Sequence, residues 1–373
     1  MRIAVPPIVF ALFAAAPAAA FDAPGTTYKV FQFPAGQMPR IDGDAVDWAM
    51  VPEAYVVGTN QMTEQDGKHA KPDPRTLDIR VKVGWIKGLN RLYFLYEAYD
   101  DYWDFSLPGL HNDTFEVVVD GDASGGPLID DGHRDLWTES VVGAARAVRD
   151  PRVTVAQSHW SYHGVHAQNY HIFTPARDKD WTMAWGSASW IKSFPHANAM
   201  TRHAVEPGRP GRVTVEFWIT PYDYAGPEGP QRAVESVLEE NKIIGLGWVI
   251  IDYDDVAAKT NNGFWTLSSK RTMFGNATDL PAFRLMPLEA QFVPPIAADW
   301  SFGVVDMERR LVAFKDGSTG ASAWKWDFGD GATSTERHPQ HSYAKPGNYV
   351  VVLDVTGPGG TARRSKVWDV QLR

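Results

Sequence analysis

The chain has 373 residues, of which 44% are hydrophobic and 22% are charged, as in an ordinary globular protein. A formal net charge of −9 disfavours a nucleic-acid partner, because such binding needs a basic surface. The absence of cysteine excludes disulfides, cysteine-ligated zinc and a thiol nucleophile. The 15 tryptophans indicate either broad β-sheets or a surface that stacks against flat ligands.

The N-terminus has the pattern of an export signal. Met1-Arg2 carries one positive charge, residues 3–13 are an apolar stretch, and Ala18-Ala19-Ala20 forms a small-residue cleavage pattern. The alternative is an uncleaved membrane anchor, but a span needs about 20 apolar residues, and this segment reaches that length only by counting alanines and prolines. We expect residues 1–20 to be removed and the mature protein, without stable membrane insertion, to be secreted or periplasmic.

Beyond the signal, the hydrophobic pattern is that of short β-strands. In residues 114–120 polar and apolar side chains alternate, which places Phe115, Val117 and Val119 on one face. Similar runs lie at residues 92–96, 213–219 and 243–251. A single helix is predicted over residues 231–240, where apolar residues follow helical spacing after Pro230. The predicted fold class is all-β.

A proline-flanked linker at residues 287–295 precedes a second domain, residues 298–373. Short strands alternate there with Gly-rich turns, which predicts a small β-sandwich. We expect its core to contain the following apolar residues: Trp326, Phe328, Tyr349, Val351 and Leu353.

This second domain resembles a polycystic kidney disease (PKD) domain, an immunoglobulin-like module. The resemblance rests on the W-D-F-G-D-G run at 326–331, on H-S-Y at 341–343 and on the spacing of residues 347–353. It implies a spacer or a surface that contacts other cell-envelope proteins. The D-F-G at 327–329 is also a kinase signature, but the other kinase motifs are missing from the sequence. We interpret it as a turn with positive-φ glycines and aspartates that accept hydrogen bonds from the loop backbone.

The larger domain, residues 22–290, carries several short motifs in a fixed order. They are I-D-G-D-A-V-D-W at 41–48, a strand ending in Asp100-Asp101, N-D-T-F-E at 112–116, E-F-W-I-T-P at 216–221 and F-R-L at 283–285. In this order they resemble carbohydrate-binding module family 9 and its relatives. The resemblance implies a large β-sandwich of antiparallel sheets that binds a polysaccharide or oligosaccharide. Some related families with this fold bind haem instead.

Saccharide recognition pairs aromatic faces with the C–H face of a sugar and polar groups with its hydroxyls. By the resemblance, Trp265 takes the place of one stacking aromatic. Leu110-His111 stands where the family has the other, so Trp103 is the upstream substitute. We expect Trp103, His111, Asp113 and Trp265 to contact the saccharide. The alternative for each tryptophan is a place in the core.

Paired acids predict a calcium site. Asp120, Asp122, Asp252 and Asp254 follow strand-like runs, as do Asp130 and Asp131, and hard oxygen ligands could converge at strand ends. The alternative is that these acids cap turns.

A group of histidines offers a different chemistry. His159, His163 and His166 lie between two strand-like runs, and neutral imidazoles bind Zn²⁺, Cu²⁺ or haem without cysteine. No H-E-x-x-H motif is present, and loop histidines also contact sugars.

Three functions remain open from the sequence. The first is an exported, non-catalytic carbohydrate-binding protein that serves polysaccharide breakdown by glycoside hydrolases. The second is a haem- or metal-binding redox module of the same sandwich type. The third is a structural or adhesive cell-surface protein. A hydrolase signature such as G-x-S-x-G is missing, so catalysis by the chain itself is the weaker expectation.

Overall fold

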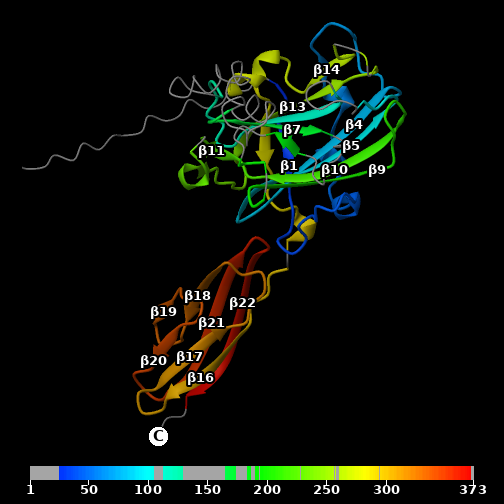
Figure 1. Ribbon diagram of the computed structural model, residues 1–373. Coiled ribbons are helices and arrows are strands. Elements are labelled where there is room, and N and C mark those ends of the chain that lie inside the picture. Colours follow the sequence, from blue (N-terminus) through cyan, green and yellow to red (C-terminus); the bar gives the residue numbers. More distant parts are fainter. Residues whose placement is uncertain are drawn as a thin grey trace, which may run out of the picture. The chain divides into compact units, whose positions relative to one another are not determined.

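The computed structural model of the protein describes residues 25–104, 112–128, 164–173, 183–185, 190–192, 194–226, 228–255, 257, 260–293 and 295–370 (Figure 1). The expected signal at residues 1–20 lies outside them. The chain divides between Pro287 and Leu288 into two compact units. No helix among the described residues is long and apolar enough to cross a membrane.

The larger unit is built from fifteen strands in its described part. They are β1 (Tyr28–Gln32), β2 (Val57–Gly58), β3 (Thr63–Glu64), β4 (Leu77–Ile86), β5 (Leu89–Asp100), β6 (Thr114–Asp120), β7 (Gln168–Phe173), β8 (Met183–Trp185), β9 (Ala197–His203), β10 (Gly211–Ile219), β11 (Tyr222–Tyr224), β12 (Val234–Glu235), β13 (Ile243–Asp252), β14 (Gly263–Thr266) and β15 (Ala282–Leu285). Short 3₁₀ helices join them: η1 (Ala45–Trp48), η2 (Glu53–Tyr55), η3 (Thr59–Gln61), η5 (Pro230–Arg232), η6 (Arg271–Phe274) and η7 (Ala277–Asp279). The four predicted strands are confirmed, within β5, β6, β10 and β13.

Thirteen of these strands form one sheet that folds into two facing layers sharing β1, and β11 and β12 form a separate two-stranded sheet. The order is β8-β7-β6-β13-β15-β1-β4-β5-β10-β9. Residues 28–30 of β1 pair with β15, and residues 31–32 pair with β4. Rings from the two halves meet in the core, where Tyr96 of β5 stacks on Phe115 of β6 with centroids 4.4 Å apart. The predicted all-β sandwich is therefore confirmed, with the expected face of β6 pointing inward.

The opening I-D-G-D-A-V-D-W motif is held by one buried carboxylate, Glu216 of β10. Its Oε2 accepts hydrogen bonds from the backbone N–H groups of Asp42, Gly43 and Asp44 at 3.1, 2.7 and 3.1 Å. Its Oε1 accepts from the indole Nε1 of Trp48 at 2.8 Å. Burial raises the pKa of Glu216. Two of the sequence motifs thus form a single anchor of the fold.

The predicted helix over residues 231–240 is wrong. The segment forms the 3₁₀ turn η5 and then the two-residue strand β12, which pairs with β11. Tertiary hydrogen bonds take the backbone groups that a helix would use: Ser236 N donates to Pro221 O, and Leu238 N donates to Asn90 Oδ1 at 3.2 Å. Helical spacing of apolar residues was therefore overridden by contacts distant in sequence.

The smaller unit begins with η8 (Ala290–Phe292) and has its own core. One sheet joins β16 (Trp300–Asp306), β17 (Leu311–Asp316) and β20 (Gln340–Ser342); the other joins β19 (Thr333–Ser334), β18 (Ala323–Asp327), β21 (Gly347–Gly357) and β22 (Gly360–Val370). Of the predicted core residues, Tyr349 packs against the cluster and the others are fully buried: Trp326, Phe328, Val351 and Leu353.

The D-F-G segment is a turn, as the sequence predicted. Gly329 and Gly331 have φ of +80° and +94°. Asp327 Oδ1 accepts from Gly329 N at 2.9 Å, and Asp330 Oδ1 accepts from Ala332 N at 3.0 Å. Asp330 Oδ2 also lies 2.7 Å from His341 Nε2. The two aspartates of the motif therefore hold the loop backbone, and Asp330 also ties it to β20.

Candidate functional site

Three buried carboxylates meet at one edge of the larger unit. Asp100 ends β5, Asp252 ends β13, and Asp113 directly precedes β6; they are 2%, 8% and 4% exposed. Antiparallel pairing of β6 with β13 sets Thr114 opposite Ile251, which brings Asp113 beside Asp252. Ligand oxygens of the three acids lie within 4.8 Å of one another.

Backbone N–H groups satisfy these carboxylates only in part. Asp113 accepts from Tyr253 N at 2.8 Å and from Asp104 N at 2.6 Å, and Asp100 Oδ1 accepts from Tyr102 N at 2.9 Å. Asp252 Oδ1 is buried and has no hydrogen-bond partner. Within the described chain, no basic side chain forms an ion pair with any of the three acids.

Burial strongly disfavours the charged form of this cluster. Burial, and after it the charge of Asp252, raises the pKa of Asp100 to about 9. Burial, and after it the charge of Asp254, raises the pKa of Asp252 to about 7. The pKa of Asp113 is raised well above its ordinary value, again chiefly by burial. Buried acids so close together must bind protons or a cation, because repulsion and desolvation would otherwise destabilise the fold.

A small cavity of about 10 Å³ adjoins the cluster, with Asp100, Asp113 and Trp103 among its walls. That volume is close to the minimum for one water molecule. A second acidic group shares one member of the first: oxygens of Asp100, Asp101 and Asp254 also lie within 4.8 Å of one another. Asp254 Oδ2 in addition accepts from Asn262 Nδ2 at 2.7 Å.

The expected convergence of all four calcium candidates is wrong. Gly245, near the start of β13, pairs with Asp120 at the end of β6. Asp120 and Asp252 therefore lie at opposite ends of β13, about 23 Å apart along the strand. Asp120 and Asp122 form a separate pair, in which burial raises the pKa of Asp120 to about 7. Asp130 and Asp131 lie outside the described residues.

Trp103 does not present an exposed ring. It is 2% exposed, belongs to the main core and donates from its indole Nε1 to Gly211 O at 2.9 Å. The prediction of a stacking face at Trp103 is wrong, because the ring fills space between the layers. Asp113 is likewise turned into the acid cluster rather than to a surface, and His111 lies outside the described residues.

Trp265 of β14 is also covered, and the prediction of an open ring is wrong here too. The indole is 5% exposed, and the imidazole of the exposed His69 stacks on it with centroids 5.6 Å apart and planes at 26°. Its Nε1 is buried with no hydrogen-bond partner. A Cβ added to Gly263 would lie 2.3 Å from this Nε1 and 3.3 Å from Asp252 Oδ2, so the indole lies over Gly263, near Asp252.

Two loops form the rim above Trp265. Residues 65–70 follow β3, and residues 260–262 directly precede β14. His69 Nε2 lies 2.9 Å from Asn262 O, and Lys68 Nζ donates to Asn261 Oδ1 at 2.6 Å. The rim thus gathers an ammonium, an imidazole and amides around one indole.

The histidine group is described only in part. His159 and His163 lie outside the described residues. His166 is half-buried, and its ring meets that of Tyr224 edge-on with centroids 5.8 Å apart. The metal or haem site proposed for the three histidines stays a prediction.

Sequence reasoning missed two parts of this edge. Asp100 was recognised only as part of a strand-ending motif, although paired acids after a long strand are a signal for a cation site. His69, which stacks on Trp265, and Lys68, which binds Asn261, lie in a polar loop with no motif, so no signal in the sequence places them at this edge.

Two β-sandwich units with separate cores thus make up the described chain. Residues 306–372 match the family model described as PKD domain, so this part of the chain is a PKD domain. The chain is similar to the PKD1 domain of Vibrio anguillarum Epp, at 28% identity and a TM-score of 0.20. The match covers 98% of that domain and 21% of this chain. The PKD1 domain from Vibrio cholerae metalloprotease PrtV is 32% identical, with 99% of it and 20% of this chain covered and a TM-score of 0.17.

The chain is also similar to a carbohydrate-binding module family 9 from Caldicellulosiruptor kristjanssonii. In the complex of that module with cellotriose, 99% of it matches 72% of this chain at 13% identity and a TM-score of 0.43. In its complex with glucose, 98% of it matches 71% of this chain at 12% identity and a TM-score of 0.42.

Proposed function

We propose that the larger unit binds a saccharide at the edge formed by residues 65–70 and the β13–β14 hairpin, with Trp265 as the stacking face. The observation that carries the proposal is the state of that indole: it lies beneath an exposed imidazole, and its Nε1–H has no acceptor. A buried donor without a partner costs about 1–3 kcal/mol. A saccharide hydroxyl would supply the acceptor.

The rim groups match the chemistry of a sugar. A pyranose has a C–H face, which stacks on indole, and hydroxyls, which both donate and accept hydrogen bonds. Lys68 and the amides of Asn261 and Asn262 are donors at the rim, and Asp254 is an acceptor. The ordered motifs shared with carbohydrate-binding module family 9 support the same ligand class.

His69 must move for the sugar to stack. Its side chain lies on a solvent-exposed loop and occupies the face of Trp265 that the pyranose would take. We propose that the saccharide displaces the imidazole. Removing the imidazole should therefore leave binding intact or tighten it.

A calcium ion next to this site is the second part of the proposal. Asp100, Asp113 and Asp252 supply carboxylate oxygens of the kind that Ca²⁺ prefers, and Asp252 Oδ1 is the unpartnered atom that points to a missing ligand. The ion would offset two of the three negative charges that these buried carboxylates carry when ionised. It would also fix the end of β13, from which the hairpin that carries Trp265 continues.

The proposed setting is outside the cytoplasm. The export pattern of residues 1–20 supports secretion or a periplasmic location. We propose a non-catalytic role there, in which the larger unit binds a polysaccharide that glycoside hydrolases degrade. The PKD domain would act as a spacer or contact other envelope proteins.

A glycan array followed by calorimetry with glucose and cellotriose, each with and without Ca²⁺, tests this function. We expect binding in the micromolar to millimolar range, about −8 to −4 kcal/mol. Trp265→Ala should abolish it, and His69→Ala should retain or tighten it. Trp324→Ala, which removes a half-buried indole from the smaller unit, is the matched control and should bind normally.

The melting temperature is measured for every variant. Loss of binding in folded Trp265→Ala supports the site. Folded wild-type protein that binds no glycan on the array and neither sugar in the calorimeter would overturn the proposal, as would a Trp265→Ala variant with unchanged affinity.

A further inference from the structure

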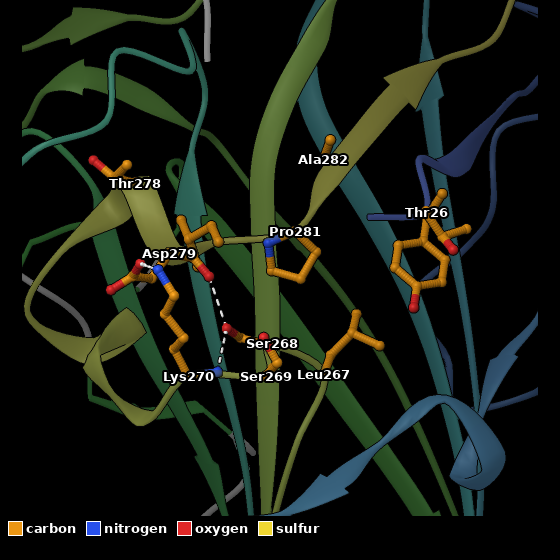
Figure 2. Close-up of a pocket in the computed structure, with 11 residues that line it drawn as sticks. Thr26, Leu267, Ser268, Ser269, Lys270, Thr278, Asp279, Pro281 and Ala282 are labelled. Atoms are coloured by element: carbon orange, nitrogen blue, oxygen red, sulfur yellow. Dashed lines mark hydrogen bonds and ion pairs between the residues drawn. The ribbon is translucent and has the colours of Figure 1, made fainter. Parts of the chain in front are cut away.

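A second cleft opens on the larger unit, between the start of β1 and residues 267–282 (Figure 2). Its volume is about 150 Å³. Trp265, Asp252 and the 65–70 loop do not contribute to its walls. It is therefore a different place on the domain from the edge discussed above.

Hydrogen bonds hold the polar wall of this cleft in a fixed geometry. Lys270 Nζ lies 2.7 Å from Asp279 Oδ1. The hydroxyl of Ser268 donates to Asp279 O at 2.7 Å and accepts from Lys270 N at 3.0 Å. Figure 2 shows Lys270 and Asp279 facing each other on one side of the cleft, with Thr26 on the other side. Ser269 and Thr278 also line it, and the Thr278 hydroxyl accepts a hydrogen bond from Gly126 N at 2.9 Å.

The remaining wall is apolar and includes an aromatic ring. Tyr28 of β1 is half-buried and stacks on Phe283 of β15, with centroids 5.0 Å apart and planes at 29°. Leu267 and Pro281 add aliphatic surface. A supported ring, aliphatic groups and several hydroxyls within one small cleft form an amphipathic surface.

We infer that this cleft is a second saccharide-binding site, which takes one neutral pyranose ring. A cavity of about 150 Å³ accepts a six-membered ring. The Lys270 and Asp279 charges cancel, so the cleft favours a neutral polyhydroxylated ligand over a phosphate or a cation. Hydroxyls of the sugar would bind the Lys270–Asp279 pair and Ser269. This inference rests on the proposed function for the class of ligand, a saccharide. The two sites are separable by experiment.

Methyl and indole NMR signals separate the two sites. The full chain, labelled at alanine and leucine methyls and at indole nitrogens, is titrated with glucose, N-acetylglucosamine, mannose and galactose. Ala282 and Leu280 line the cleft and report on it, whereas the indole Nε1–H of Trp265 reports on the other site. We expect saturable shifts of the two methyl signals with at least one sugar, with a Kd of about 1–50 mM.

Three variants decide the assignment. Ser269→Phe fills the cleft from an exposed position and should weaken the methyl response at least tenfold. Asp279→Asn leaves Lys270 unpaired and should weaken it as well. Trp265→Ala should leave it unchanged. Spectra of the free variants and their melting temperatures show that they are folded.

Methyl shifts that saturate and disappear in Ser269→Phe support the inference, even if the Trp265 indole is silent and the proposed function fails. No methyl response to any of the four sugars up to about 100 mM overturns it, whatever the indole shows. Equal responses in wild type and folded Ser269→Phe overturn it too.

Discussion

Glu216 ties together two motifs that are distant in sequence, since its two oxygens accept four hydrogen bonds from residues 42–48. Glu216→Gln replaces one oxygen with an NH₂ group that faces N–H donors. We expect it to lower the free energy of unfolding of the larger unit by about 1–3 kcal/mol, by denaturant titration. Glu206→Gln, on an exposed turn, should change it by less than about 0.5 kcal/mol.

Substitutions at Gly329 and Gly331 separate two reasons for a glycine in the turn: a positive φ, and a neighbouring backbone that leaves no room for a Cβ. Both have positive φ, but a Cβ at Gly329 would lie 2.7 Å from Val350 O, whereas one at Gly331 meets nothing within 4 Å. Gly331→Ala should destabilise the PKD domain by about 1 kcal/mol, and Gly329→Ala by about 2–4 kcal/mol. Thermal unfolding of the two variants compares them directly. Equal losses would show that the contact with β21 has no effect.

Substitution of Asp252 tests whether calcium binds at the cluster of buried acids. Calcium at about 100 times its Kd should stabilise the larger unit by about 2.7 kcal/mol, because it binds only the folded state. Asp252→Asn should abolish this gain, while Asp122→Asn at the other end of the sheet should keep it. A thermal-shift titration with CaCl₂ and EDTA measures both. An unchanged melting temperature of the wild type in excess Ca²⁺ would contradict the site.

At the scale of elements, the β13–β14 hairpin positions both Asp252 and Trp265. Gly263 opens β14 opposite Asp252, and the indole lies directly over it. Gly263→Ala would push the indole aside and should weaken saccharide binding by at least about tenfold, which is 1.4 kcal/mol. Gly275→Ala, where the nearest atom to the new Cβ is 3.9 Å away, is the matched control. Calorimetry with cellotriose measures both affinities; equal affinities would remove the hairpin from the site.

Also at this scale, β1 explains how one chain forms both layers. Its first residues pair with β15 and its last with β4, so a five-residue strand crosses from one layer to the other. Its residues are mostly buried, as expected for a strand inside a sandwich. The same strand carries Tyr28, which connects the second cleft to the core through Phe283.

At the scale of the whole molecule, the two cores share no residue among those that the structure describes. We expect two separate unfolding transitions in calorimetry. Calcium and a bound saccharide should raise only the transition of the larger unit, and Gly329→Ala should lower only that of the PKD domain. A single transition that moves with both changes would show that the units unfold together.

The sequence alone determined the fold class, four strands of the larger unit and the PKD domain. In residues 114–120 apolar residues alternate with polar ones, which predicts a strand with one face in the core. In residues 327–331 the glycines and aspartates form the turn through contacts within the segment, so the turn can be predicted from the local sequence. The helix predicted at 231–240 failed because apolar spacing is a weak local signal, and the backbone of Ser236 and Leu238 is bonded to distant residues.

Only the tertiary structure decided the site. Strand order and direction separate Asp120 from Asp252 and join Asp252 to Asp100 and Asp113, and no local pattern contains that information. Exposure of Trp103 and Trp265 depended in the same way on which loops and layers cover them. Residue type records which chemistry is available, while the pairing of distant strands determines which groups meet and which of them reach the surface.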